Sequence, residues 1–121
     1  MEGLPFGTFS YALTAEAICR ACALKDEVDT EVWGGYFLET GKFHCGLLEI
    51  EDRNVKWPDL RLTVDTSEDY EFVKRIFEVL GERGEFSLQQ IIKLCRDRPE
   101  LVEINSEIVQ KKGLAIRVRE E

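Results

Sequence analysis

The segment from Arg61 to Asp69 reads Arg-Leu-Thr-Val-Asp-Thr-Ser-Glu-Asp, and the expected fold follows from it. Residues 60–65 alternate apolar and polar side chains, which is the period of a half-buried β-strand. Thr66 or Ser67 can then cap a helix whose first turn carries two acidic residues, and these suit the positive end of the helix dipole. We therefore predict a strand that passes directly into a helix, with Asp65 at the junction.

The same two periods recur along the rest of the chain. Apolar residues repeat at helical spacing over residues 15–25, 31–40, 70–80 and 88–95. Thr14, Thr30 and Ser87 stand where N-caps are expected, and Arg98-Pro99 interrupts the last helix before further turns over residues 101–109. Strand-like alternation occurs at residues 9–13, 43–50 and 114–118. The pattern predicts an α/β fold, with interleaved helices and a small mixed sheet, in a single domain over residues 1–121.

Composition narrows the classes of function. The chain has 121 residues and a formal net charge of −8, and 44% of its residues are hydrophobic. An acidic chain without a long basic run is a poor partner for nucleic acid or for an anionic membrane surface. The first residues lack the positive and apolar regions of a signal peptide, and no stretch approaches the ~20 apolar residues of a membrane helix. We expect a cytoplasmic protein with no nucleic-acid or membrane partner.

Asp65 is the residue best placed for a role in ligand binding, and its position allows two interpretations. A carboxylate at the C-terminal end of a strand faces the crevice in which open α/β sheets bind ligands. Mg²⁺ typically takes one or two such carboxylates and completes its coordination with water and substrate phosphates. The alternative is that Asp65 simply caps the helix that follows.

The four cysteines also allow two interpretations. Cys19 and Cys22 form a C-x-x-C, and Cys45 follows His44, so these four residues could bind zinc. However, the second pair lacks the usual ligand spacing, and Cys19 and Cys22 fall within an apolar helical pattern in which small buried residues are expected. Without a secretory signal, reduced thiols are expected rather than disulfides.

Several segments of the chain resemble one family of enzymes. Residues 59–73 are similar to the late R-x-T-V-D-T-x-E-D motif of the sugar cytidylyltransferases of the spore-coat polysaccharide F family, which are related to the synthetases of CMP-sialic acid and CMP-ketodeoxyoctonate. Residues 86–105 resemble that family's closing run, which reads F-S, a hydrophobic helix, P-E-L and I-N. Residues 3–7 resemble its G-L-P-x-G loop, and residues 31–37 are a weaker echo of its E-H-V-T-P-Y segment.

This resemblance implies a fold and an activity. The chain would be the C-terminal half of a nucleotide-diphospho-sugar transferase-like fold. The reaction would couple CTP to a sugar or sugar acid with release of pyrophosphate, assisted by Mg²⁺ on the nucleotide. By motif position, Asp65 would contact the metal, and Arg61 would either lie near the sugar or phosphate or form a structural ion pair. Gly3, Pro5 and Gly7 would lie near the base or sugar.

The sequence also departs from the family pattern. It contains neither the glycine- and arginine-rich nucleotide loop nor the earlier Asp-x-Pro metal aspartate of such enzymes. The chain would then act with a separate N-terminal half or as a homodimer, or it would be a non-catalytic assembly or binding module. The aromatic residues available for a subunit interface, which could equally be core residues, are Trp33, Tyr36, Phe37 and Trp57.

Overall fold

The structure is a computed structural model that describes residues 3–26, 33–110 and 115–119. The chain divides into two compact units. The first unit combines Met1–Ser10 with Leu48–Val109, and the second combines Tyr11–Leu47 with Gln110–Glu121. The units are described separately below, and the expectation of a single domain stays a prediction.

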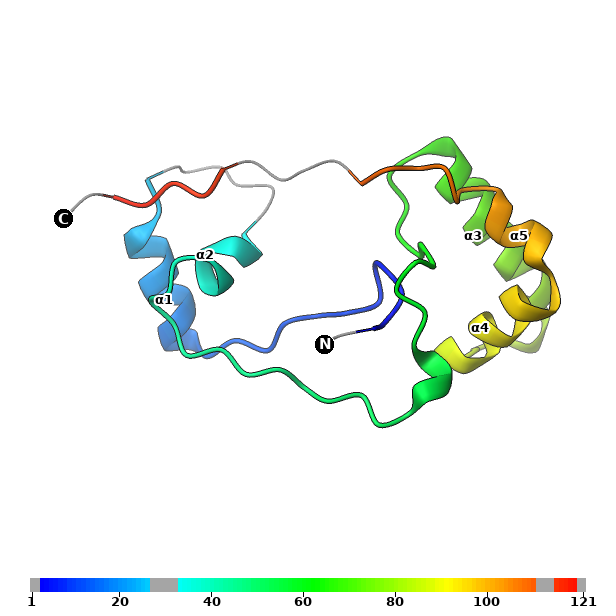
Figure 1. Ribbon diagram of the computed structural model, residues 1–121, viewed down its shortest axis with the longest axis horizontal. Coiled ribbons are helices and arrows are strands. Elements are labelled where there is room, and N and C mark those ends of the chain that lie inside the picture. Colours follow the sequence, from blue (N-terminus) through cyan, green and yellow to red (C-terminus); the bar gives the residue numbers. More distant parts are fainter. Residues whose placement is uncertain (1–2, 27–32, 111–114, 120–121) are drawn as a thin grey trace. The chain divides into compact units, whose positions relative to one another are not determined.

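The first unit is built on three α-helices, α3 (Ser67–Leu80), α4 (Leu88–Asp97) and α5 (Pro99–Glu103), shown in Figure 1. Short 3₁₀ turns, η1 (Arg53–Val55) and η2 (Gly81–Arg83), flank them. Thr66 caps α3 and Ser87 caps α4, each through a capping box, as their sequences predict. The predicted interruption at Arg98-Pro99 is also confirmed, because Pro99 occupies the first position of α5.

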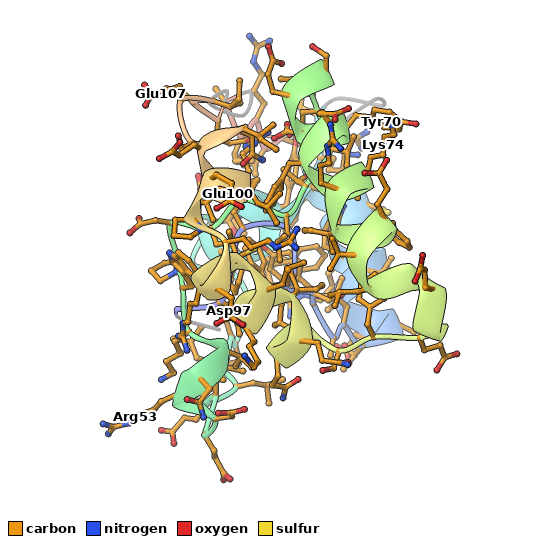
Figure 2. The ribbon with its side chains drawn as sticks, turned by 90° about the vertical axis from the view of Figure 1, so that its right-hand side faces the viewer. Arg53, Tyr70, Lys74, Asp97, Glu100 and Glu107 are labelled. Atoms are coloured by element: carbon orange, nitrogen blue, oxygen red, sulfur yellow. The ribbon has the colours of Figure 1, made fainter. Side chains whose placement is uncertain are left out.

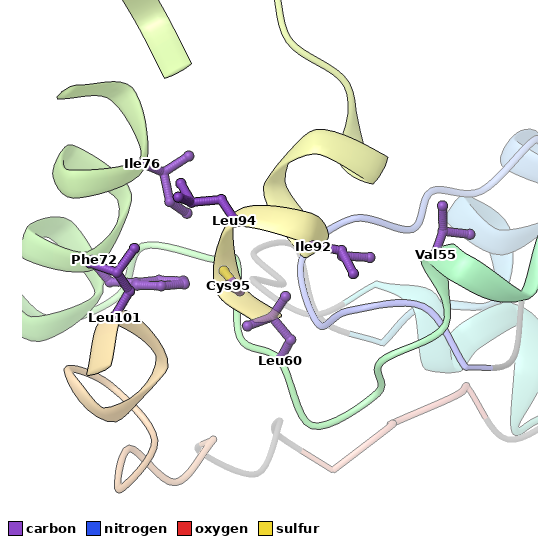
Figure 3. Close-up of a cluster of buried hydrophobic side chains, with 8 residues drawn as sticks. All are labelled: Val55, Leu60, Phe72, Ile76, Ile92, Leu94, Cys95 and Leu101. Atoms are coloured by element: carbon purple, nitrogen blue, oxygen red, sulfur yellow. The ribbon is translucent and has the colours of Figure 1, made fainter. Parts of the chain in front are cut away.

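The core of this unit forms where α3, α4 and α5 meet. Figure 3 shows Phe72 and Ile76 of α3 directed toward side chains of α4 and α5. Leu60 extends the cluster into the segment that precedes α3, and it is fully buried together with Phe72. Burial of large apolar side chains is the main stabilising term in such a unit, at roughly 1.5–3 kcal/mol for each side chain removed from water. The complete cluster comprises Val55, Leu60, Phe72, Ile76, Ile92, Leu94, Cys95 and Leu101.

The second unit contains α1 (Ala15–Leu24) and α2 (Gly34–Leu38). Thr14 caps α1, as predicted. Ala21, Tyr36 and Phe37 form a small buried cluster between the two helices. The predicted cap Thr30 lies outside the described residues, and α2 is shorter than the expected helix over residues 31–40.

The predicted strands do not form a sheet within the described residues. Residues 60–65 pair only at Arg61, in a parallel bridge with Phe6, and the C-terminal segment pairs only at Val118, in an antiparallel bridge with Lys25. Residues 9–13 and 43–50 have no strand pairing. A period of two marks an extended segment with one buried face, but a strand also requires a neighbour along several residues. The strand assignments are therefore wrong for these residues, and the nucleotide-diphospho-sugar transferase-like fold stays a prediction.

The outer face of α3 carries both aromatic and charged side chains. Figure 2 shows Tyr70 and Lys74 projecting from this helix, and Tyr70 is 62% exposed. Lys74 and Arg75 form ion pairs with Glu71 and Glu78 along the helix. Exposed pairs of this kind contribute little to stability, so this face is a solvated surface rather than a second core.

Candidate functional site

The loop of residues 3–7 is hydrogen-bonded to residues 57–62, although the two segments are far apart in the sequence. Trp57 N donates to Gly3 O, Phe6 N donates to Leu60 O and Leu62 N donates to Phe6 O, each over 2.8 Å. Phe6 also places its ring 5.5 Å from the guanidinium carbon of Arg61. The two segments that resemble the same enzyme family therefore form one structural element.

Gly7 allows this close approach. Its φ of +95° lies in the region that side chains disfavour, and an added Cβ would lie 2.8 Å from Thr63 N. The loop can turn away from residues 60–62 only if this position has no side chain. This explains in physical terms why the last position of the G-L-P-x-G pattern is a glycine.

Arg61 and Asp69 form a buried, bidentate ion pair beneath the loop. Arg61 Nε donates to Asp69 Oδ1 over 2.8 Å, and Arg61 Nη2 donates to Asp69 Oδ2 over 3.0 Å. Arg61 is 8% exposed and Asp69 is fully buried. These hydrogen bonds from Arg61 lower the pKa of Asp69 well below its usual value; burial acts in the opposite direction, and Asn105 adds to the lowering. Both charges are therefore retained inside the unit.

Asp69 also closes the start of α3. Its Oδ2 accepts from Thr66 N over 3.1 Å, while Thr66 Oγ1 accepts from Asp69 N over 3.2 Å. This reciprocal arrangement is a capping box, so the helix cap is Thr66 and not Asp65. The interpretation of Asp65 as the cap is thus wrong. The same Asp69 oxygen accepts from Asp65 N over 3.1 Å, which fixes the main chain at the junction.

Asp65 differs from Asp69 in its access to solvent. Its side chain is 51% exposed, and its Oδ2 accepts from Arg61 Nη2 over 2.7 Å. A half-exposed carboxylate held by a fixed partner can supply one ligand to a cation, which matches the one or two carboxylates that Mg²⁺ uses beside substrate phosphates. The described residues contain no group of three or more potential metal ligands, so a cation here would depend on oxygen atoms from a bound ligand.

Four of the predicted site residues are brought together, and the fifth supports them. Gly3, Gly7, Arg61 and Asp65 all lie on the loop and the segment that it contacts. Pro5 is fully buried, so its ring packs inside the unit. Substrate contact by these residues stays a prediction. Arg61 forms a structural ion pair with Asp69, which is one of the two roles that the sequence predicts for it.

Two residues of this cluster were not predicted as central. The sequence predicts Asp69 only as an acidic residue in the first turn of a helix, and it places Asn105 at the end of the segment that resembles the family's closing run. The spacing of Asp69 three residues after Thr66 is the capping-box signal, but the pairing with Arg61 depends on tertiary structure. Asn105 lies 44 residues beyond Arg61 and has no local signal for this contact.

The second unit contains an apolar cavity and most of the cysteines. The cavity, of about 260 Å³, is lined by side chains of α1 and α2 together with Leu13, Lys25 and Trp33. Cys19, Cys22 and Cys45 are exposed, which corrects the expectation that the first two are buried, whereas Cys95 of the first unit is buried. Of the four aromatic residues proposed for an interface, Tyr36 and Phe37 are buried, Trp57 packs partly against the core and Trp33 is 44% exposed.

The chain is similar to a curated bacterial protein over more than half of its length. It is similar to a spore coat polysaccharide biosynthesis protein, with 32% identity over 83 residues. That protein is "Spore coat polysaccharide biosynthesis protein SpsF" of Bacillus subtilis (strain 168). The matched region covers 69% of this chain and 34% of SpsF, so the chain spans about a third of the length of that relative. Over the matched residues, the chain is similar in sequence to that spore coat polysaccharide biosynthesis protein.

Other comparisons add no relative. No family model matches the chain, and no solved structure matches it. Within residues 3–26, 33–110 and 115–119, none of the helices has the length and apolar character needed to cross a bilayer.

Proposed function

We propose that this chain forms part of a sugar nucleotidyltransferase that couples CTP to a sugar or sugar acid and releases pyrophosphate, in the biosynthesis of a surface polysaccharide. The similarity to SpsF supports the biological setting. The observation that carries the proposal is the set of main-chain hydrogen bonds between residues 3–7 and residues 57–62. The second of these segments lies directly before Asp65 in the sequence. The site would lie where this loop and the start of α3 meet.

Each side chain of the cluster has a distinct part in this proposal. Asp65, whose side chain is 51% exposed, would offer a carboxylate oxygen to Mg²⁺ carried by the nucleotide, and Mg²⁺ would balance the triphosphate charge when bound. Arg61 would orient Asp65 rather than bind phosphate, because its guanidinium is committed to two carboxylates. Gly7, exposed at the end of the loop, would let a base or sugar approach the main chain.

The proposed activity requires parts that this chain does not supply. Neither the full sequence nor its described residues provide the glycine- and arginine-rich nucleotide loop. We therefore propose that an N-terminal half outside this sequence completes the nucleotide site, because a second copy of this chain would lack the same loop. The exposed aromatic residues Tyr70 and Trp33 are available, one in each unit, for such a contact.

A non-catalytic assembly or binding module is the second candidate function. One observation favours it: Asp65 is the single exposed carboxylate of the cluster, and it is already paired with Arg61. A divalent cation would have to compete with that ion pair. In this case the fold around Asp69 would be kept as a scaffold without nucleotide chemistry.

Calorimetric titration of CTP with Mg²⁺ separates the two functions. Asp65→Ala removes the proposed ligand, and Asp59→Ala serves as a matched control because Asp59 is an exposed aspartate in the same segment. Saturable binding that requires Mg²⁺, survives in the Asp59 variant and is lost in the Asp65 variant supports the transferase proposal. A natural chain that binds no nucleotide, alone or with an added N-terminal half, would favour the non-catalytic module.

A further inference from the structure

Asn105 is a buried polar residue just after α5, and its side chain reaches back to the cluster. It is 2% exposed. Its Nδ2 donates to Asp69 Oδ1 over 2.9 Å and to Arg61 O over 3.2 Å. One amide group therefore contacts the acidic partner of the ion pair and the main chain of the basic partner.

The chemistry of these contacts selects an amide. Both groups that face the Asn105 nitrogen, a carboxylate and a main-chain carbonyl, are hydrogen-bond acceptors, so the residue between them must donate. An aspartate at position 105 would place a third acceptor there, with a second negative charge beside Asp69. An alanine would remove the donor and leave buried acceptors with fewer partners, which is costly in a dry interior.

The effect of Asn105 extends to Asp65 through one carboxylate. Asp69 accepts from Asn105 and Arg61 on Oδ1, and from Arg61, Asp65 N and Thr66 N on Oδ2. The rotation of this carboxylate therefore sets both the direction of the guanidinium and the main chain at Asp65. Every buried side-chain nitrogen or oxygen in the described part of the chain has a hydrogen-bond partner. A rotation of the Asp69 carboxylate would therefore break existing hydrogen bonds.

We infer that Asn105 is a positioning residue, which acts through Asp69 and Arg61 to hold the exposed carboxylate of Asp65 toward a nucleotide-bound divalent cation. This inference rests on the proposed function. Residues that do not bind a metal themselves but orient the residues that do typically contribute about 10–100-fold to metal affinity. We expect Asn105→Ala to weaken the affinity for CTP with Mg²⁺ by at least about tenfold.

The test combines nuclear magnetic resonance with a binding measurement on the full chain. The first readout is hydrogen exchange of the Asp65 and Thr66 amides and of the Arg61 Nε–H group. Each of these groups donates a hydrogen bond to the Asp69 carboxylate. The second readout is the affinity for CTP with Mg²⁺. Asn105→Ala is compared with the natural chain and with Asn54→Ala, a control at an exposed asparagine. Should Asn105→Ala not fold, Asn105→Ser, which keeps one donor, replaces it.

Faster exchange of these three groups together with weaker nucleotide binding, in a variant whose other amides stay protected, supports the inference. Unchanged exchange and affinity would overturn it, as would rapid exchange of the three groups in the natural chain itself. If the natural chain binds no nucleotide, the proposed function fails separately. The exchange readout then decides alone: faster exchange in the variant supports a holding role for Asn105, and unchanged exchange contradicts it.

Discussion

Arg61 Nε lies 2.8 Å from Asp69 Oδ1 inside the first unit, so two opposite charges are buried together beneath the loop of residues 3–7. Buried ion pairs are expensive to desolvate and are stabilising only while both partners are present. The pair also orders the start of α3 and the main chain at Asp65. The stability of this unit and the shape of the candidate site therefore depend on the same carboxylate.

Removal of the Asp69 charge is expected to destabilise the first unit strongly. Asp69→Asn leaves Arg61 buried without its main partner, and losses of this kind are about 3–5 kcal/mol in the free energy of unfolding. Glu71→Gln on the same helix is the control, because Glu71 forms only exposed ion pairs and should cost less than about 1 kcal/mol. Urea unfolding followed by circular dichroism measures both. Equal effects of the two substitutions would show that the buried pair has no special role.

Acid is expected to weaken the first unit through Asp69. Its pKa is lowered in the folded state by hydrogen bonds from Arg61, so the folded carboxyl binds a proton less readily than the unfolded one. Its stabilising contribution is then complete above the ordinary carboxyl pKa of about 4 and is lost as the pH falls through the lower folded value. Carbon-13 detection of the Asp69 carboxyl follows its titration directly. A titration midpoint at the ordinary value would contradict the buried pair.

Substitution of Gly7 should disrupt the contact between the loop and residues 60–63. Gly7→Ala combines a disfavoured φ of +95° with a Cβ placed 2.8 Å from Thr63 N. Gly84→Ala is the matched control, because Gly84 has a φ of +86° and nothing within 4 Å of the added Cβ. Backbone strain costs about 1–3 kcal/mol at either site, and the close contact adds a further loss at Gly7 alone. Thermal unfolding that shows equal losses would argue against the close approach.

The four cysteines should separate into two classes of reactivity. Cys19, Cys22 and Cys45 are exposed, whereas Cys95 is buried and its pKa is raised to about 11 by desolvation. Because the thiolate is the reactive form, iodoacetamide at neutral pH should modify three cysteines readily and Cys95 only on unfolding. Mass spectrometry of the labelled chain, with and without urea, counts the modified sites. Rapid labelling of Cys95 in the folded chain would contradict its place in the core.

The same shift predicts a loss of stability in alkali. The folded pKa of Cys95 lies above the unfolded value, so the neutral thiol is favoured by folding. Its contribution is present below the ordinary thiol pKa of about 8.5 and is lost as the pH rises toward the folded value. Unfolding of Cys95→Ala, compared with that of the natural chain between neutral and alkaline pH, isolates this group. If the free energy of unfolding depends on pH in the same way for both proteins, Cys95 does not contribute to the loss of stability in alkali.

The helices were predictable because their signals are local. Thr14, Thr66 and Ser87 each lie directly before an apolar pattern of helical spacing, and each caps the expected helix. Pro99 ends one helix pattern and begins another. These features need no information from distant parts of the chain.

The strands were not predictable in the same way. Residues 60–65 alternate because Leu60 is buried and Leu62 packs against the core, but only Phe6 lies beside them as a bridge partner. Hydrophobic periodicity reports which face is buried and does not report whether a neighbouring strand exists. An extended segment packed on helices and a true strand therefore give the same pattern.

The candidate site was predictable only in part. The motif predicts Arg61 and Asp65 as site residues of one segment, and the resemblance adds the loop of residues 3–7, which the structure shows in contact with that segment. The burial of Asp69 and the contact from Asn105 depend on how α5 packs against the start of α3, which a single sequence does not encode locally. The sequence consequently predicts for Asp69 only a role at the start of the helix.

Backbone chemical shifts recorded during a titration with CTP and Mg²⁺ test the central claim most directly. The claim is that residues 3–7 and the segment ending at Asp65 together form part of one nucleotide site, so the amides of Gly7, Thr63 and Asp65 should shift together and saturate at one affinity. Mg²⁺ alone and CTP alone are the controls. Coordinated shifts that need both components would support the account. Shifts absent from these residues, or confined to the second unit, would contradict it.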